Sequence, residues 1–119
     1  MEIKNLEKEI IDDIYIYKFI WEIDETNVDD IFQDIFETFA WKKIIFDLSK
    51  LKYWNSKFIW YLASLDENLE NEWWKTCIIV SDNLIKEILE IAWINDIIAI
   101  KYTLEEAFAE VNKVKSKIN

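Results

Sequence analysis

The chain has 119 residues, of which 52% are apolar and 16% aromatic, a composition typical of one folded domain rather than of a disordered segment. Its 14 lysines face 24 acidic residues, and the resulting net charge of −10 repels nucleic-acid phosphates and anionic lipid surfaces, so direct binding to either is not expected. No apolar run approaches the roughly 18 residues that span a bilayer, and MEIKNLEKEI at the start contains no signal-peptide core, so we expect a cytoplasmic protein.

The first part of the chain predicts an edge strand, a buried strand and an amphipathic helix. Residues 2–10 indicate the edge strand, with Asp12 and Asp13 in the turn that follows. Residues 13–20, DIYIYKFI, are apolar at nearly every position, which is typical of a strand covered on both faces. Apolar residues at helical spacing then predict a helix over about 27–40. The opposite face of this helix carries acidic residues, which we interpret as a solvated surface: Asp29, Asp30, Asp34 and Glu37.

The second part of the chain alternates strands with helices. Residues 43–48 and 76–81 are short apolar runs that predict two buried strands. Between them, a helix is expected over about 56–72. Apolar residues at helical spacing indicate another helix over 84–92, and DIIAIKY at 96–102 predicts another strand.

The last predicted helix opens at Thr103, and Glu106 stands at the Thr-x-x-Glu spacing of a capping box. Residues 112–119 are expected to be the end of this helix or a tail. Because strands alternate with helices of this length, we expect an α/β fold. It should be a single layered domain over residues 1–119, with a mainly parallel central sheet of about four or five strands and about four helices.

The tryptophans stand where glycine is expected. The chain has 7 Trp and no Gly. Trp41, the pair Trp73 and Trp74, and Trp93 each follow a predicted helix, at a position that often takes the left-handed conformation and favours Gly. A Cβ costs roughly 1–2 kcal/mol in that conformation, so we expect a positive φ at Trp73, Trp74 or Trp93 as the backbone trace of glycine.

A family resemblance appears at the same positions. The run IIFDLSKLKYWNSKFIWYLASL resembles the signature of the STAS domain, the anti-sigma factor antagonist fold. That signature is a strand ending in Asp-Leu, a short loop, and then Asp-Ser-Ser-Gly-Ile-Gly at the start of a helix. WEID, EWWK and ILEIAWINDII resemble further segments of the family, so the likeness extends over most of the chain. Tryptophans fall where the family pattern has Gly at the following positions: Trp21, Trp60, Trp73, Trp74 and Trp93.

We therefore interpret most of the tryptophans as glycines of the natural protein. Some bacteria read the UGA codon as glycine, and translating such a gene with UGA as tryptophan would produce this pattern. Trp41 fits a frequent family Gly, whereas Trp54 falls where the family usually has a hydrophobic residue. The alternative is a genuine Trp-rich surface, on which an exposed Trp73 and Trp74 would mark a contact site for carbohydrate or protein.

The resemblance singles out the start of the second predicted helix. In STAS antagonists the serine that matches Ser56 is phosphorylated by its partner, a kinase that is also the anti-sigma factor. The match is partial, because Asn55 replaces the usual Asp, Lys57 a small residue, and Phe58 a Gly that lets the partner approach closely. Either Asn55 or Ser56 is a suitable cap for the helix. The resemblance implies a partner-binding surface made of Asp24, Asn55, Ser56, Lys57 and Phe58.

Two further carboxylates each have two readings. Asp24, after WEI, matches a family position near the loop between strand and helix, or it is simply a turn or cap residue. Asp47 ends a predicted parallel strand, at the sheet edge where binding residues collect, or it only anchors the loop over 49–55.

The sequence contains few of the residue types and motifs that enzymatic catalysis uses. The chain has no His or Arg, no phosphate-binding loop and no Cys/His metal cluster. Cys77 lies in an apolar run without a His to activate it, so we expect a small buried hydrophobic side chain rather than a nucleophile. We therefore expect no catalytic site, no metal site and no cofactor.

Three classes of function remain. The first is an anti-sigma factor antagonist that changes partners according to the phosphorylation of Ser56, with a kinase-type anti-sigma factor as its partner and a phosphatase as a second candidate partner. The second is a STAS scaffold that binds proteins around the second helix without phosphorylation, and that is able to self-associate. The third, a small enzyme that uses the acidic edge, is the least supported by these residues.

Overall fold

The computed structural model describes residues 5–38, 43–69, 76–96 and 98–113 of the chain. Its strands are β1 (Leu6–Ile11), β2 (Ile14–Phe19), β3 (Trp21–Ile23), β4 (Lys43–Asp47), β5 (Leu51–Trp54), β6 (Thr76–Ile79) and β7 (Ala99–Lys101). Its helices are α1 (Val28–Thr38), α2 (Ser56–Leu69), α3 (Asn83–Ile91) and α4 (Leu104–Val111), with a 3-10 turn η2 (Ile94–Asp96). The expected α/β fold is confirmed.

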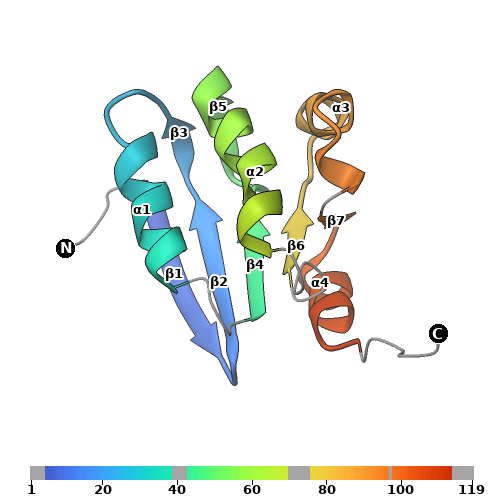
Figure 1. The fold of residues 1–119 in the computed structure, drawn as a ribbon. Helices are drawn as coiled ribbons and strands as arrows, with labels where there is room; N and C mark the ends of the chain where they lie inside the picture. Colours follow the sequence, from blue (N-terminus) through green and yellow to red (C-terminus); the bar gives the residue numbers. More distant parts are fainter. Residues whose placement is uncertain (1–4, 39–42, 70–75, 97, 114–119) are drawn as a thin grey trace.

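A mainly parallel sheet forms the centre of the molecule (Figure 1). The strand order is β1-β2-β4-β6-β7, in which β1 runs antiparallel to β2 and the other neighbours are parallel. As expected, Asp12 and Asp13 form the turn between β1 and β2. The apolar runs of β2, β4 and β6 are buried on both faces, because helices cover the sheet from both sides.

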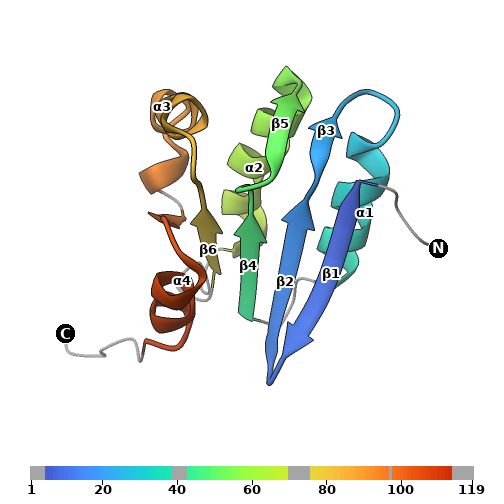
Figure 2. The ribbon, with the colours of Figure 1, turned by 180° about the vertical axis from the view of Figure 1, so that it is seen from behind.

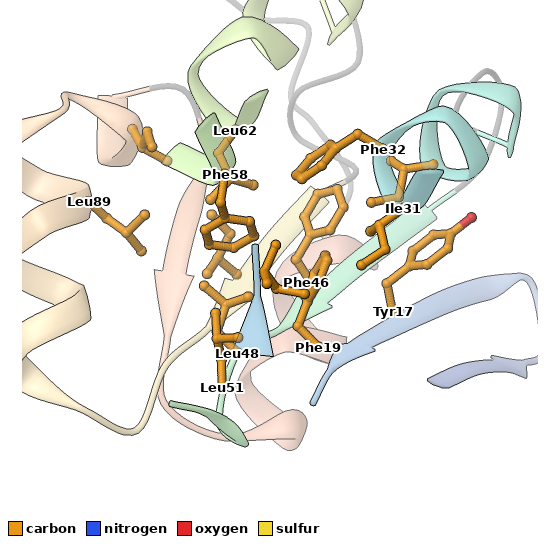
Figure 3. Packing of buried hydrophobic residues seen from close by; sticks show 14 of the residues in the cluster. Tyr17, Phe19, Ile31, Phe32, Phe46, Leu48, Leu51, Phe58, Leu62 and Leu89 are labelled. Carbon is orange, nitrogen blue, oxygen red and sulfur yellow. The ribbon is translucent and has the colours of Figure 1, made fainter. Parts of the chain in front are cut away.

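The two faces of the sheet have separate hydrophobic cores. Figures 1 and 2 show α1 and α2 on one face. There, Phe19, Phe32, Phe46 and Phe58 are buried together with residues of α3, and Figure 3 shows these aromatic side chains pointing toward one another. α4 packs on the other face through a smaller cluster of buried residues: Ile14, Ile16, Ile45, Cys77, Ile79, Ala107 and Val111. The burial expected for Cys77 is confirmed.

A second, two-stranded sheet includes residues that the sequence predicts as the loop over 49–55. β3 pairs with β5 in parallel, and the amide of Trp21 donates to the carbonyl oxygen of Lys50 at 3.0 Å. The interpretation of residues 49–55 as a loop is therefore wrong for β5. Strands this short carry too little periodicity to be recognised alone, and their pairing depends on a segment distant in the sequence.

The chain after α3 also differs from expectation. The strand predicted over 96–102 shortens to β7, because η2 occupies the preceding residues. Ile94 and Ile98 are both buried, and the amide of Ile98 donates to the carbonyl of Ile94 at 2.9 Å. Ile98, which lies within the predicted strand, is therefore buried at the bend before β7 and is not part of the strand.

The predicted capping box of α4 is confirmed. The hydroxyl of Thr103 accepts from the amide of Glu106 at 3.1 Å, and the carboxylate of Glu106 accepts from the amide of Thr103 at 3.2 Å. The helix ends at Val111, while residues 114–119 lie outside the described part. Among the described residues, no helix is both long enough and apolar enough to cross a membrane.

Two tryptophans have the backbone conformation that glycine favours. The φ angle is 65° at Trp21 and 66° at Trp93. The expectation for Trp93 is thus confirmed, and Trp21 adds a second case at a bend between strands. Trp41, Trp73 and Trp74 lie outside the described residues. A side chain with a Cβ is strained at a positive φ, so both positions are ones where Gly would be more stable.

Candidate functional site

The candidate site lies at the end of the sheet where the parallel strands finish. The starts of α1 and α2 lie together at this end, and α3 stands beside α2 (Figure 1). In open α/β sheets this is the edge where ligands and partners usually bind. Ser56 is the first residue of α2, and it is exposed there.

Asn55, not Ser56, caps α2. The side-chain oxygen Oδ1 of Asn55 accepts a hydrogen bond from the amide of Phe58 at 3.0 Å, the geometry of a helix cap. This contact satisfies one of the free N–H groups at the start of the helix. Of the two caps that the sequence allowed, Asn55 fills the role, and the hydroxyl of Ser56 is left on the surface.

Ser56 borders an apolar cleft between α2 and α3. The cleft has a volume of about 400 Å³ and is lined by Trp54, Asn55, Ser56, Ile59, Ile88, Ile91 and Ala92. The two polar residues come from the start of α2, and the remaining lining is apolar. A cleft of this size and lining is suited to apolar groups with a few polar contacts at one end.

Lys57 points toward α1 instead of the cleft. Its Nζ atom lies 2.8 Å from Oδ1 and 3.1 Å from Oδ2 of Asp29, and the hydroxyl of Tyr61 donates to Asp29 Oδ1 at 2.6 Å. The hydrogen bond with Asp29 raises the pKa of Lys57, and those from Lys57 and Tyr61 lower the pKa of Asp29. The same acid therefore holds the residue next to Ser56 and a tyrosine one turn further along α2.

The acidic face of α1 is only partly a solvated surface. Besides Asp29, Asp34 is also paired, because Lys8 Nζ lies 2.9 Å from its Oδ2. The interpretation of a solvated face is confirmed for the exposed Asp29, Asp30 and Glu37, whereas Asp34 is half-buried beside Lys8. Periodicity places acids on the outer face of a helix, but it does not show which lysines on other elements reach them.

Phe58 belongs to the core and not to the contact surface. Its side chain is 0% exposed and lies edge-on to Phe19, with ring centroids 5.5 Å apart. Its side chain is therefore not exposed for direct contact with a partner in this structure. The third residue of α2 faces the sheet, so an aromatic side chain there is drawn into the apolar layer between helix and sheet.

Asp24 is a turn residue before α1. Its Oδ1 atom accepts hydrogen bonds from the amide of Thr26 at 2.9 Å and from the hydroxyl of Thr26 at 2.6 Å, which lower the pKa of Asp24. Asn27, which sequence reasoning missed, accepts from the amide of Asp24 at 2.9 Å and donates to the carbonyl of Glu22 at 3.1 Å. The closely spaced Asp, Thr and Asn are the signal that would have indicated this hydrogen-bonded turn.

Asp47 anchors the loop that leads to β5. Its Oδ1 atom accepts from the amide of Ser49 at 2.9 Å. Of the two readings of this residue, the anchoring role is the one that the hydrogen bond supports. Asp47 is therefore not counted among the residues of the candidate site.

Sequence reasoning missed the apolar wall that α3 gives to the cleft. Ile88 and Ile91 belong to α3 and Ala92 caps it, and the apolar spacing indicated this helix without showing which of its residues stay outside the core. Ile91 is nevertheless 75% exposed. An apolar residue just outside the core-facing stripe of a helix is the signal that could have pointed to this wall.

Acid, base and metal chemistry have little support at this site. Cys77 lies in the separate cluster under α4, away from the cleft, and burial raises the pKa of its thiol to about 12, so it remains protonated near neutral pH. In the part of the chain that the structure describes, no group of three or more His, Cys, Asp or Glu residues is placed to hold a metal ion. The described site consists of the exposed Ser56 hydroxyl at the edge of a cleft with a largely apolar lining.

Comparisons with solved structures show the same fold elsewhere. An anti-sigma factor antagonist from Mycobacterium paratuberculosis superposes with a TM-score of 0.80 at 19% identity, over 91% of this chain and 93% of that one. The anti-sigma factor antagonist SpoIIAA in its unphosphorylated form gives a TM-score of 0.74 at 16% identity, over 93% and 99%. At such low identity these likenesses show the fold alone. No curated protein sequence matches the chain.

A family model carries the assignment further than the superpositions do. The model of the STAS domain matches residues 5–107, which is most of the chain and includes both helices that line the cleft. The match agrees with the resemblance seen in the signature before α2 and with the observed fold. The chain belongs to the STAS domain family.

Proposed function

We propose that the chain is a regulatory protein-binding module of the anti-sigma factor antagonist type, whose exchange of partners is controlled by phosphorylation of Ser56. One observation carries the proposal. Ser56 is exposed at the start of α2, is not the helix cap, and borders an apolar cleft. A kinase can reach its hydroxyl, and a phosphate placed there would alter the edge of a surface suited to protein contact.

The fold should tolerate a phosphate at this position. Phosphorylation adds about −1.5 to −2 charges, and the free N–H groups and dipole at a helix N-terminus favour an anion. Because the cap comes from Asn55, modification of the Ser56 hydroxyl removes no cap. The expected effect on the stability of the folded chain is therefore small.

The partner interface should not tolerate it. A dianion beside the apolar lining must lose water when a partner covers the cleft, and this loss is costly unless a cation compensates. The chain has no arginine, and Lys57 is held by Asp29 on the side of α1. Phosphorylation is therefore expected to release the partner that binds the unmodified chain.

The expected partner is a kinase-type anti-sigma factor, with a phosphatase to reverse the modification. Proteins of the antagonist family act by binding other proteins, and the site described here offers contact rather than catalysis. Because the chain carries a net charge of −10, the partner surface should be neutral to basic, and association should slow as salt rises.

Titration of a candidate kinase-type anti-sigma factor, with and without ATP, tests the proposal. The parent chain, Ser56→Ala and Ser56→Asp are compared, and phosphate incorporation is followed by mass spectrometry. Ser81→Asp serves as the matched control, because Ser81 is also exposed and lies outside the lining of the cleft. Phosphate on Ser56 together with weaker binding of Ser56→Asp supports the proposal, whereas equal weakening by Ser81→Asp would attribute the effect to net charge.

A second candidate function is a scaffold that binds proteins through the same cleft without phosphorylation. Asn55 favours it, because this residue replaces the carboxylate that usually precedes the phosphorylated serine in the family. The apolar cleft is also present without any modification. A scaffold would bind its partner about equally as the parent, Ser56→Ala and Ser56→Asp, and ATP would leave the chain unmodified.

A further inference from the structure

The α3 wall of the cleft carries exposed apolar side chains that do not pack into the core. Leu84 and Ile91 are 57% and 75% exposed, and Ile88 lies between them at helical spacing. The residues of α3 that do enter the core, Ile85 and Leu89, lie on a neighbouring side of the helix. Single exposed apolar residues are common, but Ile88 and Ile91 also line the apolar cleft.

The exposed charge beside this wall is negative. Glu87 lies between Leu84 and Ile91 on the helix surface, three residues after one and four before the other. It is exposed, and within the described ranges it forms no ion pair. Lys86, which precedes it, is already paired with Glu90, with 3.0 Å between Nζ and Oε2. Glu87, which is negative, is therefore the charged side chain of α3 that lies beside this wall and has no ion-pair partner among the described residues.

The α2 wall adds no free cation to balance it. The residues that α2 contributes to the cleft are uncharged, and Lys57 on the same helix is held by Asp29 on α1. The cleft lining itself is uncharged, and Glu87, the helix neighbour of the cleft-lining Ile91, is the exposed acid beside it. Apolar side chains next to a positive charge are its natural complement.

We propose that the cleft between α2 and α3 takes a segment of the partner protein that presents aliphatic side chains next to a Lys or Arg. The proposal rests on the proposed function and names the chemistry of the docking element. The aliphatic groups would cover Ile59, Ile88 and Ile91, and the cation would lie by Glu87. A second copy of this chain is a poor occupant, because each copy carries a net charge of −10.

The arrangement also explains why the phosphate would matter. Ser56 is on α2 and Glu87 is on α3, so a cation paired with Glu87 is expected to lie on the α3 side of the cleft. The part of the segment that meets Ser56 is then aliphatic. A phosphate there must be desolvated against apolar groups instead of pairing with the cation.

Selection from a random peptide library displayed on phage tests this inference without a known partner. The library is selected on the immobilised parent chain, and the enriched peptides are synthesised and titrated against variants by fluorescence anisotropy. Ile91→Ser shortens the apolar wall, and Glu87→Gln removes the exposed acid beside it. Matched controls are Ile10→Ser, where Ile10 is also exposed but on β1, and Glu105→Gln on α4.

We expect enriched peptides to carry aliphatic residues next to Lys or Arg. Ile91→Ser should lower the affinity of the chain for these peptides about fivefold or more, because the substitution removes most of an apolar contact surface. Glu87→Gln should weaken them by about two- to fivefold, the range of an exposed charge pair, and both controls should change affinity by less than about twofold. Peptides without this pattern, no enrichment, or affinity unchanged in Ile91→Ser would overturn the inference.

Two further outcomes separate this inference from neighbouring ones. Sedimentation velocity measures whether the parent chain self-associates. If it does, and Ile91→Ser abolishes the self-association, then a second copy of the chain occupies the cleft and the docking proposal is overturned. If Ser56→Asp weakens the anti-sigma partner while Ile91→Ser leaves peptide affinity unchanged, the docking inference fails and the proposed function stands. If the peptides bind as expected but Ser56→Asp has no effect on the partner, the docking inference stands and phosphorylation control fails.

Discussion

Asp29 on α1 holds Lys57 on α2 through both of its carboxylate oxygens, at 2.8 and 3.1 Å from the lysine Nζ. The same carboxylate accepts the hydroxyl of Tyr61, whose ring stacks on Phe32 with centroids 4.6 Å apart. Polar and aromatic contacts thus join the two helices next to Ser56. The residue after the candidate phosphorylation site is fixed to a neighbouring helix and directed away from the cleft.

This network predicts a pH dependence of stability. The hydrogen bonds from Lys57 and Tyr61 lower the pKa of Asp29 below its ordinary 3.8 in the folded chain. The contribution of Asp29 is therefore fully present above pH 3.8 and is lost as pH falls through the lowered pKa. Asp29→Asn should lose less stability between neutral and strongly acidic pH than the parent, as measured by urea unfolding.

Asp30→Asn is the control for that measurement. Asp30 is the exposed neighbour of Asp29 on the same helix, and it makes no ion pair among the described residues. Its acid profile should follow that of the parent. If Asp29→Asn and Asp30→Asn gave the same profile, the three-residue network would contribute nothing measurable in solution.

The cap of α2 gives a second prediction. Asn55→Ala should lower the free energy of unfolding by about 0.5–2 kcal/mol, because the amide of Phe58 loses its side-chain acceptor. Ser56→Ala should change it by less than about 0.5 kcal/mol, since Ser56 is exposed and does not cap the helix. Chemical denaturation of both variants decides the point. A larger loss in Ser56→Ala than in Asn55→Ala would reverse the assignment of the cap.

The buried position of Phe58 gives a third prediction. Phe58→Ala should lower the free energy of unfolding by about 3–5 kcal/mol, because it opens a cavity among Phe19, Phe32 and Phe46. Tyr53→Ala, at a side chain that is mostly exposed, is the comparison and should cost far less. A mild effect of Phe58→Ala would return this residue to the contact surface that the family resemblance suggested.

How far the sequence predicts the structure depends on the kind of signal. β2, β4 and β6 are predictable because strands covered on both faces are nearly continuous apolar runs. The capping box of Thr103 and Glu106 is predictable because it depends on local spacing alone. Local signals of this type sufficed for most of the α/β fold.

Features that depend on distant segments escaped prediction. The pairing of β3 with β5 joins residues that are far apart in the chain, and neither strand is long enough to show a period. The cleft escaped because periodicity marks the apolar side of α3 without showing where α2 stops covering it. At the site, the resemblance located Ser56, but only the packing shows that Phe58 faces inward and Lys57 faces α1.

The tryptophans lead to a fourth prediction. Trp93 has a φ of 66° and is 71% exposed, so Trp93→Gly should raise the free energy of unfolding by roughly 1–2 kcal/mol through relief of backbone strain. Trp60 lies inside α2, where Gly is unfavourable, so Trp60→Gly should lower it by roughly 0.5–1 kcal/mol. Thermal unfolding of the two variants gives both signs. If the free energy of unfolding changed in the same direction in both variants, the positive φ at Trp93 would not limit stability.

The origin of these tryptophans is a separate question with its own measurement. If most of them are glycines read through UGA codons, the intact mass of the protein from its natural source will be lower than that of the printed sequence. The difference should equal a whole number of Trp-to-Gly replacements. A native mass that matches 7 tryptophans would contradict the codon hypothesis and leave a genuine Trp-rich surface.

The central claim is that a negative group on Ser56 controls partner binding without unfolding the chain. Calorimetric titration of the parent and Ser56→Asp against the candidate kinase-type anti-sigma factor tests it most directly, with thermal unfolding measured in parallel. We predict that Ser56→Asp binds at least about 10-fold more weakly, or about 1.4 kcal/mol, while its unfolding temperature stays near that of the parent. Equal affinities for the two proteins, with no phosphate incorporated when ATP is supplied, would contradict the claim.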